Sequence, residues 1–307
     1  MRTTFIQALA EIAEKDDRVW LVCGDLGYSV LETFAERFPG RFLNAGVAEQ
    51  NMTGIAAGLA LSGKIVFTYS IANFAVMRCL EQIRNDVCYH NLDVKIVAVG
   101  GGLAYGPAGY THHAVEDLAV MRAMPHMTVL APGDPVETRL VMQRILDRRG
   151  PCYLRLGKAG EPIVHASVPA HFEIGKAIEV RPGEDITLMT TGGTLQLTVQ
   201  AAEVLARAGR SVRVLSMPTV EPLDTEAILA AGRVTKRIVT VEEHGRGGLS
   251  AGVAEVLATS GMAVQFFPLR LADEPVVEGG SQEFLRAAQG LSVRGVVDAA
   301  QSLLDGG

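Results

Sequence analysis

The chain has 307 residues, of which 48% are hydrophobic and 20% are charged. At roughly 150 residues per domain, this length predicts about two domains. The composition excludes a disordered protein, because disorder requires low hydrophobicity and high charge. The net charge is −6 and no run of Lys and Arg stands out, so we expect no nucleic-acid partner.

Nothing in the sequence predicts a membrane segment or an export signal. The longest apolar stretches, such as Ile55–Leu61, are far too short to span a bilayer. The first residues carry acidic side chains where a signal peptide stays apolar. The four cysteines share no metal-type spacing and are typical of buried, reduced thiols. We therefore expect a cytoplasmic protein with no membrane partner and no metal site of its own.

The first half of the chain alternates short β-branched runs with helical patterns. A short strand is expected to end near Asn44, and five further runs predict buried strands: Val19–Cys23, Lys64–Tyr69, Val94–Val99, Met127–Ala131 and Cys152–Leu156. Helical periodicity covers Met52–Leu61, Ala75–Cys88, Val115–Ala123 and Val136–Asp147. Alternation of this kind predicts a parallel sheet that is covered on both faces.

The second half restarts this pattern after residues 159–183, which are rich in Gly and Pro and are predicted to be a linker. Strands are expected over Ile186–Thr190, Ser211–Ser216, Arg237–Glu242 and Ala263–Pro268, and helices over Leu195–Ala208 and Leu249–Ser260. The sequence thus predicts an α/β protein of two domains, 1–158 and 184–307. Each domain is expected to hold a mostly parallel sheet flanked by helices.

The most informative segment follows the strand that ends near Asn44. The chain turns at Gly46 into a helix, and Glu49 lies in its first turn. A first-turn Glu often only complements the helix dipole. However, Gly54 and Gly58 lie inside this helix, where each costs about 1 kcal/mol relative to Ala. The small side chains predict close approach of another backbone or subunit beside Glu49.

A second Gly-rich turn, Glu242-Glu-His-Gly-Arg-Gly-Gly, follows a predicted strand in the second half and precedes a helix. Such a helix N-terminus can bind an anion. A tight turn with a purely structural role is the simpler interpretation, and both stay open here.

The sequence Gly-Val-Ala-Glu-Gln-Asn-Met-Thr-Gly-Ile-Ala around Glu49 resembles the cofactor-activating segment of the transketolase family. The resemblance continues through Gly24-Asp-Leu, Phe74–Asn85, Gly106–Glu116, Ala131-Pro-Gly-Asp and the second half. No single motif is unique to this family, but their order and spacing together are specific for it. The chain resembles the pyrimidine-binding and last domains of transketolases and deoxyxylulose-phosphate synthases, and more weakly the beta subunits of 2-oxo acid dehydrogenases.

The resemblance implies that thiamine diphosphate binds between domains of two different chains. Glu49 would then form a hydrogen bond with N1′ of the pyrimidine ring. This bond favours the imino form, whose 4′ nitrogen removes the proton from C2 of the thiazolium ring. Phe74 matches the position that stacks on the pyrimidine, worth about 0.5–1.5 kcal/mol beyond area burial. Without this context Phe74 is a core residue. Ile71 and Asp25 would lie beside the cofactor.

A Gly-rich loop begins at Gly100, but its spacing is not that of a dinucleotide fingerprint. By resemblance His112 matches the family's active-site histidine. His113 stands where transketolases usually carry Gln. Both would contact substrate, although a structural role for each stays open. Lys158 matches an Arg that binds the sugar phosphate in the family. Lys can bind phosphate as a point charge, but it cannot form the bidentate hydrogen bonds of Arg.

Two more positions depart from the transketolase pattern. Ala108 replaces an Asp that forms a hydrogen bond with a substrate hydroxyl in the family. Gly100 replaces a His that helps to bind the donor substrate. We expect extra space at both positions. Together with Lys158, these changes predict a substrate other than the ordinary pentose phosphates.

The family's Gly-Asp-Gly segment with a downstream Asn pair, which holds the diphosphate and Mg²⁺, is not found in this sequence. The resemblance therefore implies an N-terminal partner subunit that holds both, in an α2β2 assembly. The predicted function is the beta half of a split transketolase-like enzyme, which moves a two-carbon ketol or acyl unit from a keto donor to an aldehyde or other acceptor. Alternatives are a 2-oxo acid dehydrogenase beta subunit, a non-catalytic assembly subunit and, more distantly, a nucleotide-binding module, whose fingerprint is missing.

Overall fold

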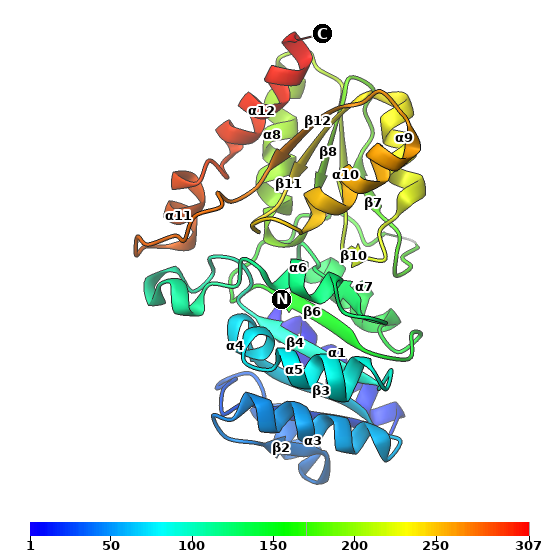
Figure 1. The fold of residues 1–307 in the computed structure, drawn as a ribbon, viewed down its shortest axis with the longest axis vertical. Coiled ribbons are helices and arrows are strands. Elements are labelled where there is room, and N and C mark those ends of the chain that lie inside the picture. Colours follow the sequence, from blue (N-terminus) through cyan, green and yellow to red (C-terminus); the bar gives the residue numbers. More distant parts are fainter. Residues whose placement is uncertain (170, 307) are drawn as a thin grey trace.

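The computed structural model describes residues 1–169 and 171–306 and contains two sheets, each flanked by helices. In Figure 1 the sheet of the N-terminal half lies below that of the C-terminal half. The strand order is β10-β5-β6-β4-β3-β1-β2 in the first sheet and β12-β11-β8-β9-β7 in the second. This architecture confirms the predicted fold class of two α/β units with mostly parallel sheets.

Parallel strands form nearly all of the first sheet. They are β1 Val19–Cys23, β2 Phe42–Asn44, β3 Ile65–Ile71, β4 Val94–Val99, β5 Thr128–Leu130 and β6 Cys152–Leu156. Their side chains are almost entirely buried in β3, β4 and β6. Helices cover both faces, so a central strand is mostly apolar on both of its faces and is visible in the sequence as a short apolar run.

The helices of the first half are α1 Arg2–Lys15, α2 Glu32–Arg37, α3 Glu49–Leu61, α4 Ala72–Met77, α5 Leu80–Gln82, α6 Asp117–Arg122 and α7 Pro135–Arg144. The single helix predicted over residues 75–88 is wrong in detail. In the structure the helical segment begins at Ala72, breaks after Met77 and ends as a π-helix over Ile83–Cys88. A wider π turn of this kind re-aims the side chains around it and is common near functional sites.

The second sheet contains β7 Ile178–Arg181, β8 Ile186–Thr190, β9 Val212–Ser216, β11 Arg237–Val241 and β12 Gln265–Leu269. Its helices are α8 Leu195–Arg207, α9 Thr225–Val234, α10 Leu249–Ser260, α11 Gln282–Ala288 and α12 Val293–Asp305. Residues 178–181 belong to the stretch predicted as a linker, but they form β7. This strand pairs antiparallel with β9 at the sheet edge.

One strand crosses between the two halves. β10, Thr219–Glu221, comes from the second half of the chain but pairs antiparallel with β5 of the first sheet. The backbone N–H of Ala131 also donates to Pro218 O (2.8 Å), and that of Gly192 donates to Ala131 O (2.9 Å). Backbone hydrogen bonds therefore join the two halves directly.

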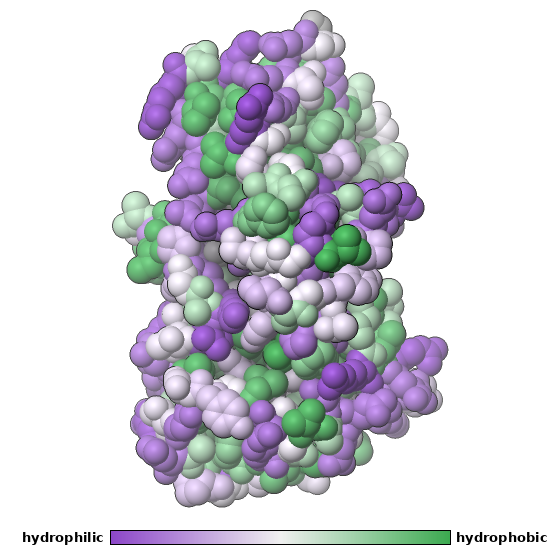
Figure 2. All heavy atoms as spheres, turned by 90° about the vertical axis from the view of Figure 1, so that its left-hand side faces the viewer, coloured by the Kyte–Doolittle hydropathy of each residue, from purple (hydrophilic) through white to green (hydrophobic). Residues whose placement is uncertain are grey.

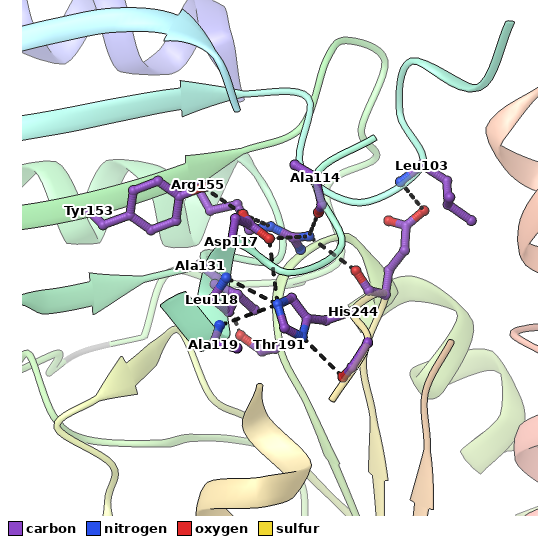
Figure 3. A network of polar contacts seen from close by, with 12 residues as sticks. Leu103, Ala114, Asp117, Leu118, Ala119, Ala131, Tyr153, Arg155, Thr191 and His244 are labelled. Atoms are coloured by element: carbon purple, nitrogen blue, oxygen red, sulfur yellow. Dashed lines mark hydrogen bonds and ion pairs between the residues drawn. The ribbon is translucent and has the colours of Figure 1, made fainter. Parts of the chain in front are cut away.

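A buried polar network lies where the halves meet (Figure 3). Arg155, at the end of β6, is only 5% exposed, and its Nε donates to Asp117 Oδ2 at 2.8 Å. The hydroxyl of Tyr153 donates to the same oxygen at 2.5 Å. Burial raises the pKa of Tyr153 well above its usual value, so this hydroxyl keeps its proton. Arg155 Nη2 also reaches the carbonyl of Glu243 in the second half, at 3.1 Å.

His244 completes this network from the second half of the chain. Its Nε2 accepts hydrogen bonds from the backbone N–H groups of Leu118 (3.1 Å) and Ala119 (3.3 Å) at the start of α6. An accepting Nε2 places the ring proton on Nδ1, which faces Gly245 O at 3.1 Å. The imidazole of His244 thus satisfies two N–H groups of α6 and fixes this helix against the second half.

The Gly-rich loop after β4 is held by the same contact between halves. Glu243 Oε1 accepts from the backbone N–H of Leu103 at 3.1 Å. Gly102 has φ +65°, and a Cβ at this position would collide with the Glu243 carboxylate. Glycine is therefore required for both conformation and close approach. The loop and α11 extend to the left in Figure 1, and Figure 2 shows that face with apolar and polar residues interspersed.

All four cysteines are buried and free, as expected from their spacing. Within residues 1–169 and 171–306, no helix combines the length and apolar character needed to cross a bilayer.

Candidate active site

Glu49 begins α3, at the edge of the first sheet where the parallel strands end. In open α/β sheets, ligands bind outside these carboxyl ends. The Glu49 side chain is only 3% exposed, and its Oε2 accepts a hydrogen bond from Arg78 Nη1 at 3.0 Å. Gly24 follows β1, and a Cβ there would lie 3.4 Å from Glu49 Cγ. A larger residue at position 24 would therefore press against the carboxylate's stem.

Phe74 lies in α4, which follows β3, and Arg78 lies one helical turn later, directly after the last residue of α4. Residues spaced i, i+4 share one face of a helix. The Arg78 guanidinium carbon lies 4.0 Å from the centroid of the Phe74 ring. Arg78 thus connects the aromatic ring of Phe74 to the buried carboxylate of Glu49.

His112 approaches Phe74 from the Gly-rich loop. The ring centroids are 5.0 Å apart in an edge-to-face arrangement with an interplanar angle of 64°. Asn73 Nδ2 donates to Thr111 O at 2.7 Å and fixes the loop to α4. A pocket of about 650 Å³ opens here, lined by Asn73, Phe74, Met77, Arg78, Tyr110, Thr111, His112, His113 and Glu116.

His113 is 1% exposed, and both of its ring nitrogens are buried without a hydrogen-bond partner in the part of the chain that the structure describes. Burial lowers its pKa below the ordinary value of 6.5, so the ring is neutral at pH 7. An unpaired buried polar group costs about 1–3 kcal/mol. A bound ligand atom that pairs with this imidazole would recover part of that cost.

Lys158 follows β6 and is exposed, with its Nζ 4.7 Å from the centroid of the Tyr105 ring. Tyr105 in turn lies 6.1 Å from the His112 ring. Extra space beside Gly100 was expected, but a Cβ at Gly100 would overlap the ring of Tyr105. That space is therefore filled by an aromatic side chain. Ala108 is exposed in a short turn.

Asp25 and Ile71 flank this site. Asp25 is exposed, and its Oδ1 accepts from Asn44 Nδ2 at 2.9 Å. It directly follows Gly24, which lies against Glu49. Ile71 is half-buried at the end of β3 and immediately precedes α4. Neither residue lines the pocket beside Phe74.

The structure thus connects most of the predicted residues through two that the sequence analysis did not select. Arg78 bridges Glu49 and Phe74, and Tyr105 lies between His112 and Lys158. The i, i+4 spacing from Phe74 was an available signal for Arg78. Nothing in the sequence indicated which residue the Tyr105 ring would contact.

The Gly-rich turn after β11 proves to be a helix cap. Glu242 is buried, and its two carboxylate oxygens accept from the backbone N–H groups of Leu249 (2.7 Å) and Ser250 (2.8 Å). These are N–H groups of the first turn of α10, where an anion would otherwise bind. The structural interpretation of this turn is therefore the one that the geometry supports.

Two family models match this chain. The model described as "Transketolase, pyrimidine binding domain" covers residues 1–160, and "Transketolase, C-terminal domain" covers residues 175–296. The chain therefore belongs to the transketolase family.

Relatives that match over nearly their whole length show which kind of transketolase protein this chain resembles. The chain is 40% identical to an apulose-4-phosphate transketolase subunit of Phocaeicola vulgatus, over 97% of this chain and 96% of the relative. It is 37% identical to the 6-deoxy-6-sulfo-D-fructose transketolase subunit of Clostridium sp. MSTE9, over 99% and 94%. A solved structure described as "Split gene transketolase, inactive beta4 tetramer" matches with a TM-score of 0.91 and 37% identity, over 99% and 98%. The chain corresponds to the beta subunit of split transketolase-like enzymes.

Proposed function

We propose that Glu49 and Phe74 hold the aminopyrimidine ring of thiamine diphosphate, and that this chain transfers a two-carbon ketol unit together with a diphosphate-binding subunit. The observation that carries the proposal is the buried carboxylate of Glu49 joined to the Phe74 ring by one planar group, the Arg78 guanidinium. This spacing fits a flat group that stacks on Phe74 and shares a proton with the Glu49 carboxyl group at its edge, and an aminopyrimidine is such a group.

The residues of this chain would then divide the work. Glu49 holds and shares one proton with a ring nitrogen, and Phe74 fixes the plane of the ring. When bound, thiamine diphosphate supplies the electron sink for ketol transfer. His112 Nδ1 lies 3.0 Å from Thr111 Oγ1, which leaves Nε2 for a substrate oxygen. His113 offers a neutral imidazole in the lining of the pocket beside Phe74.

We extend the proposal to the assembly. An N-terminal-type subunit would hold the diphosphate and Mg²⁺, and an α2β2 heterotetramer in the cytoplasm would complete each site. The related beta4 tetramer, which consists of beta chains and is described as inactive, supports the need for a second kind of subunit.

The isolated chain is expected to be inactive and to bind thiamine diphosphate at least about 100-fold more weakly than the two-subunit complex, which corresponds to about 2.8 kcal/mol. The reason is that the charged diphosphate and Mg²⁺ would be held by the other subunit. Isothermal titration calorimetry with thiamine diphosphate and Mg²⁺ measures both affinities. Equally tight binding by the isolated chain would contradict the proposed division of the site.

Substrate preference is expected to depart from that of ordinary transketolases. Ala108 cannot accept a hydrogen bond from a substrate hydroxyl, and losing such a partner costs about 1–3 kcal/mol. Lys158 keeps a positive charge, so at least one substrate should carry an anionic group. The names of two relatives support the expectation of an anionic substrate, because they specify a phosphorylated sugar and a sulfo sugar.

Ala108→Asp is therefore expected to raise kcat/KM for xylulose phosphate and ribose phosphate by about 5- to 160-fold, the kinetic equivalent of 1–3 kcal/mol. Steady-state assays of the complex measure this, with Ala108→Asn as the matched uncharged control. The proposal fails if the wild-type complex already prefers these two pentose phosphates. An unchanged or lower kcat/KM in the Asp variant would also count against it.

A further inference from the structure

Arg78 makes two contacts that the proposed function assigns to a bound aminopyrimidine. Its Nη1 donates to Glu49 Oε2 at 3.0 Å, and its guanidinium carbon lies 4.0 Å from the centroid of the Phe74 ring. The group that bridges these two side chains occupies the space between them. A ring that stacked on Phe74 and bonded to Glu49 would need the same space.

The chemistry of the two groups explains why one can replace the other. A guanidinium is planar, stacks on aromatic faces and donates N–H groups from its edge. Glu49 is 3% exposed, and a buried carboxylate without a partner is strongly unfavourable. Arg78 therefore keeps this carboxylate paired whenever no other donor is bound there.

The rest of the Arg78 side chain leaves it free to move. It follows the last residue of α4, and its side chain is 48% exposed, in contrast to the buried carboxylate that it contacts. The guanidinium can leave by rotating its own torsions, without unpacking the core around Glu49.

We propose that Arg78 is a gate on the aminopyrimidine site, closed when its guanidinium lies between Phe74 and Glu49 and opened when a ligand ring takes its place. The inference rests on the proposed function, because it concerns the same two side chains, Glu49 and Phe74. The closed form competes with the ligand, so the apparent Kd is the intrinsic Kd divided by the fraction of molecules that are open.

Arg78→Met tests the gate, because Met keeps an unbranched side chain but has neither the charge nor the donors. If the gate is closed in about nine-tenths of molecules, the variant complex should bind thiamine diphosphate about tenfold more tightly in calorimetry. The matched control is Arg84→Met. Arg84 is an exposed arginine of the following π-helix that donates to Asn85, and its variant should bind like the wild type.

Unchanged or weaker binding by the Arg78→Met complex would overturn the gate while leaving the proposed function intact. A wild-type complex that bound no thiamine diphosphate would overturn both. These two failures are distinguishable, because only the second is seen in the wild type.

A second measurement uses the isolated full chain and needs no ligand. Urea unfolding of Arg78→Met, Glu49→Leu and the double variant forms a double-mutant cycle, because Met and Leu each remove one partner of the hydrogen bond. We expect the unfolding constants to be non-additive by about 2- to 160-fold, the usual range for residues in direct contact. Additive effects would show that the closed contact does not form in solution and would overturn the gate.

Discussion

Glu49→Gln is expected to lower the rate of proton exchange at C2 of bound thiamine diphosphate by about 10²- to 10⁴-fold, the usual contribution of a positioned acid or base. Gln can still form one hydrogen bond with a ring nitrogen, but it cannot take up and share a proton as the carboxylate does. The fold should stay intact, because Gln has nearly the same shape and its carbonyl can still accept from Arg78.

Hydrogen–deuterium exchange of the cofactor, followed by NMR in the reconstituted complex, measures this step directly. Glu81→Gln, which changes an exposed Glu of α5 in the same way, is the matched control and should exchange at the wild-type rate. Near-normal exchange in Glu49→Gln would remove Glu49 from its assigned role.

Asp117→Ala is expected to destabilise the chain by about 3–5 kcal/mol. The substitution leaves the Arg155 guanidinium buried without its carboxylate, and removing one partner of a buried ion pair carries a cost of this size. Tyr153 loses its acceptor at the same time. Urea denaturation followed by circular dichroism measures the change in the free energy of unfolding.

Asp147→Ala is the control for this prediction, because the Arg144–Asp147 pair is exposed on both sides. Exposed ion pairs contribute little to stability, so this variant should unfold close to the wild type. If Asp117→Ala were equally mild, the buried network of Figure 3 would contribute little to stability.

Much of the fold could be predicted because its central strands are buried on both faces. β1, β4, β6 and β8 begin and end where the sequence predicts them, since each is a run of mostly apolar or β-branched residues. The helices α9, α11 and α12 were not predicted, although each starts at a side chain that caps it: Asp224, Ser281 and Ser292. That local signal was present. β10 had no local signal, because its three residues become a strand only through pairing with a distant part of the chain.

In the candidate site too, residues with a local sequence signal could be predicted and residues that depend on tertiary contacts could not. Glu49, Phe74 and His112 were selected because their motifs resemble a family, and the structure places Phe74 in contact with His112 and, through Arg78, with Glu49. Their catalytic roles remain predictions. Arg78 and Tyr105 were not selected because each matters through its tertiary neighbours. The filled space beside Gly100 also depends on where the Gly-rich loop places one aromatic ring.

The crossing of β10 has a consequence for how the molecule can be divided. A fragment ending at residue 158 would contain all strands of the first sheet except β10, the strand that pairs with β5. The unpaired backbone groups of β5 would then face solvent along an open edge, which is a template for association with other chains. Expression of the pyrimidine-binding half alone should therefore favour aggregates, and a fragment meant to stay monomeric should retain residues 219–221.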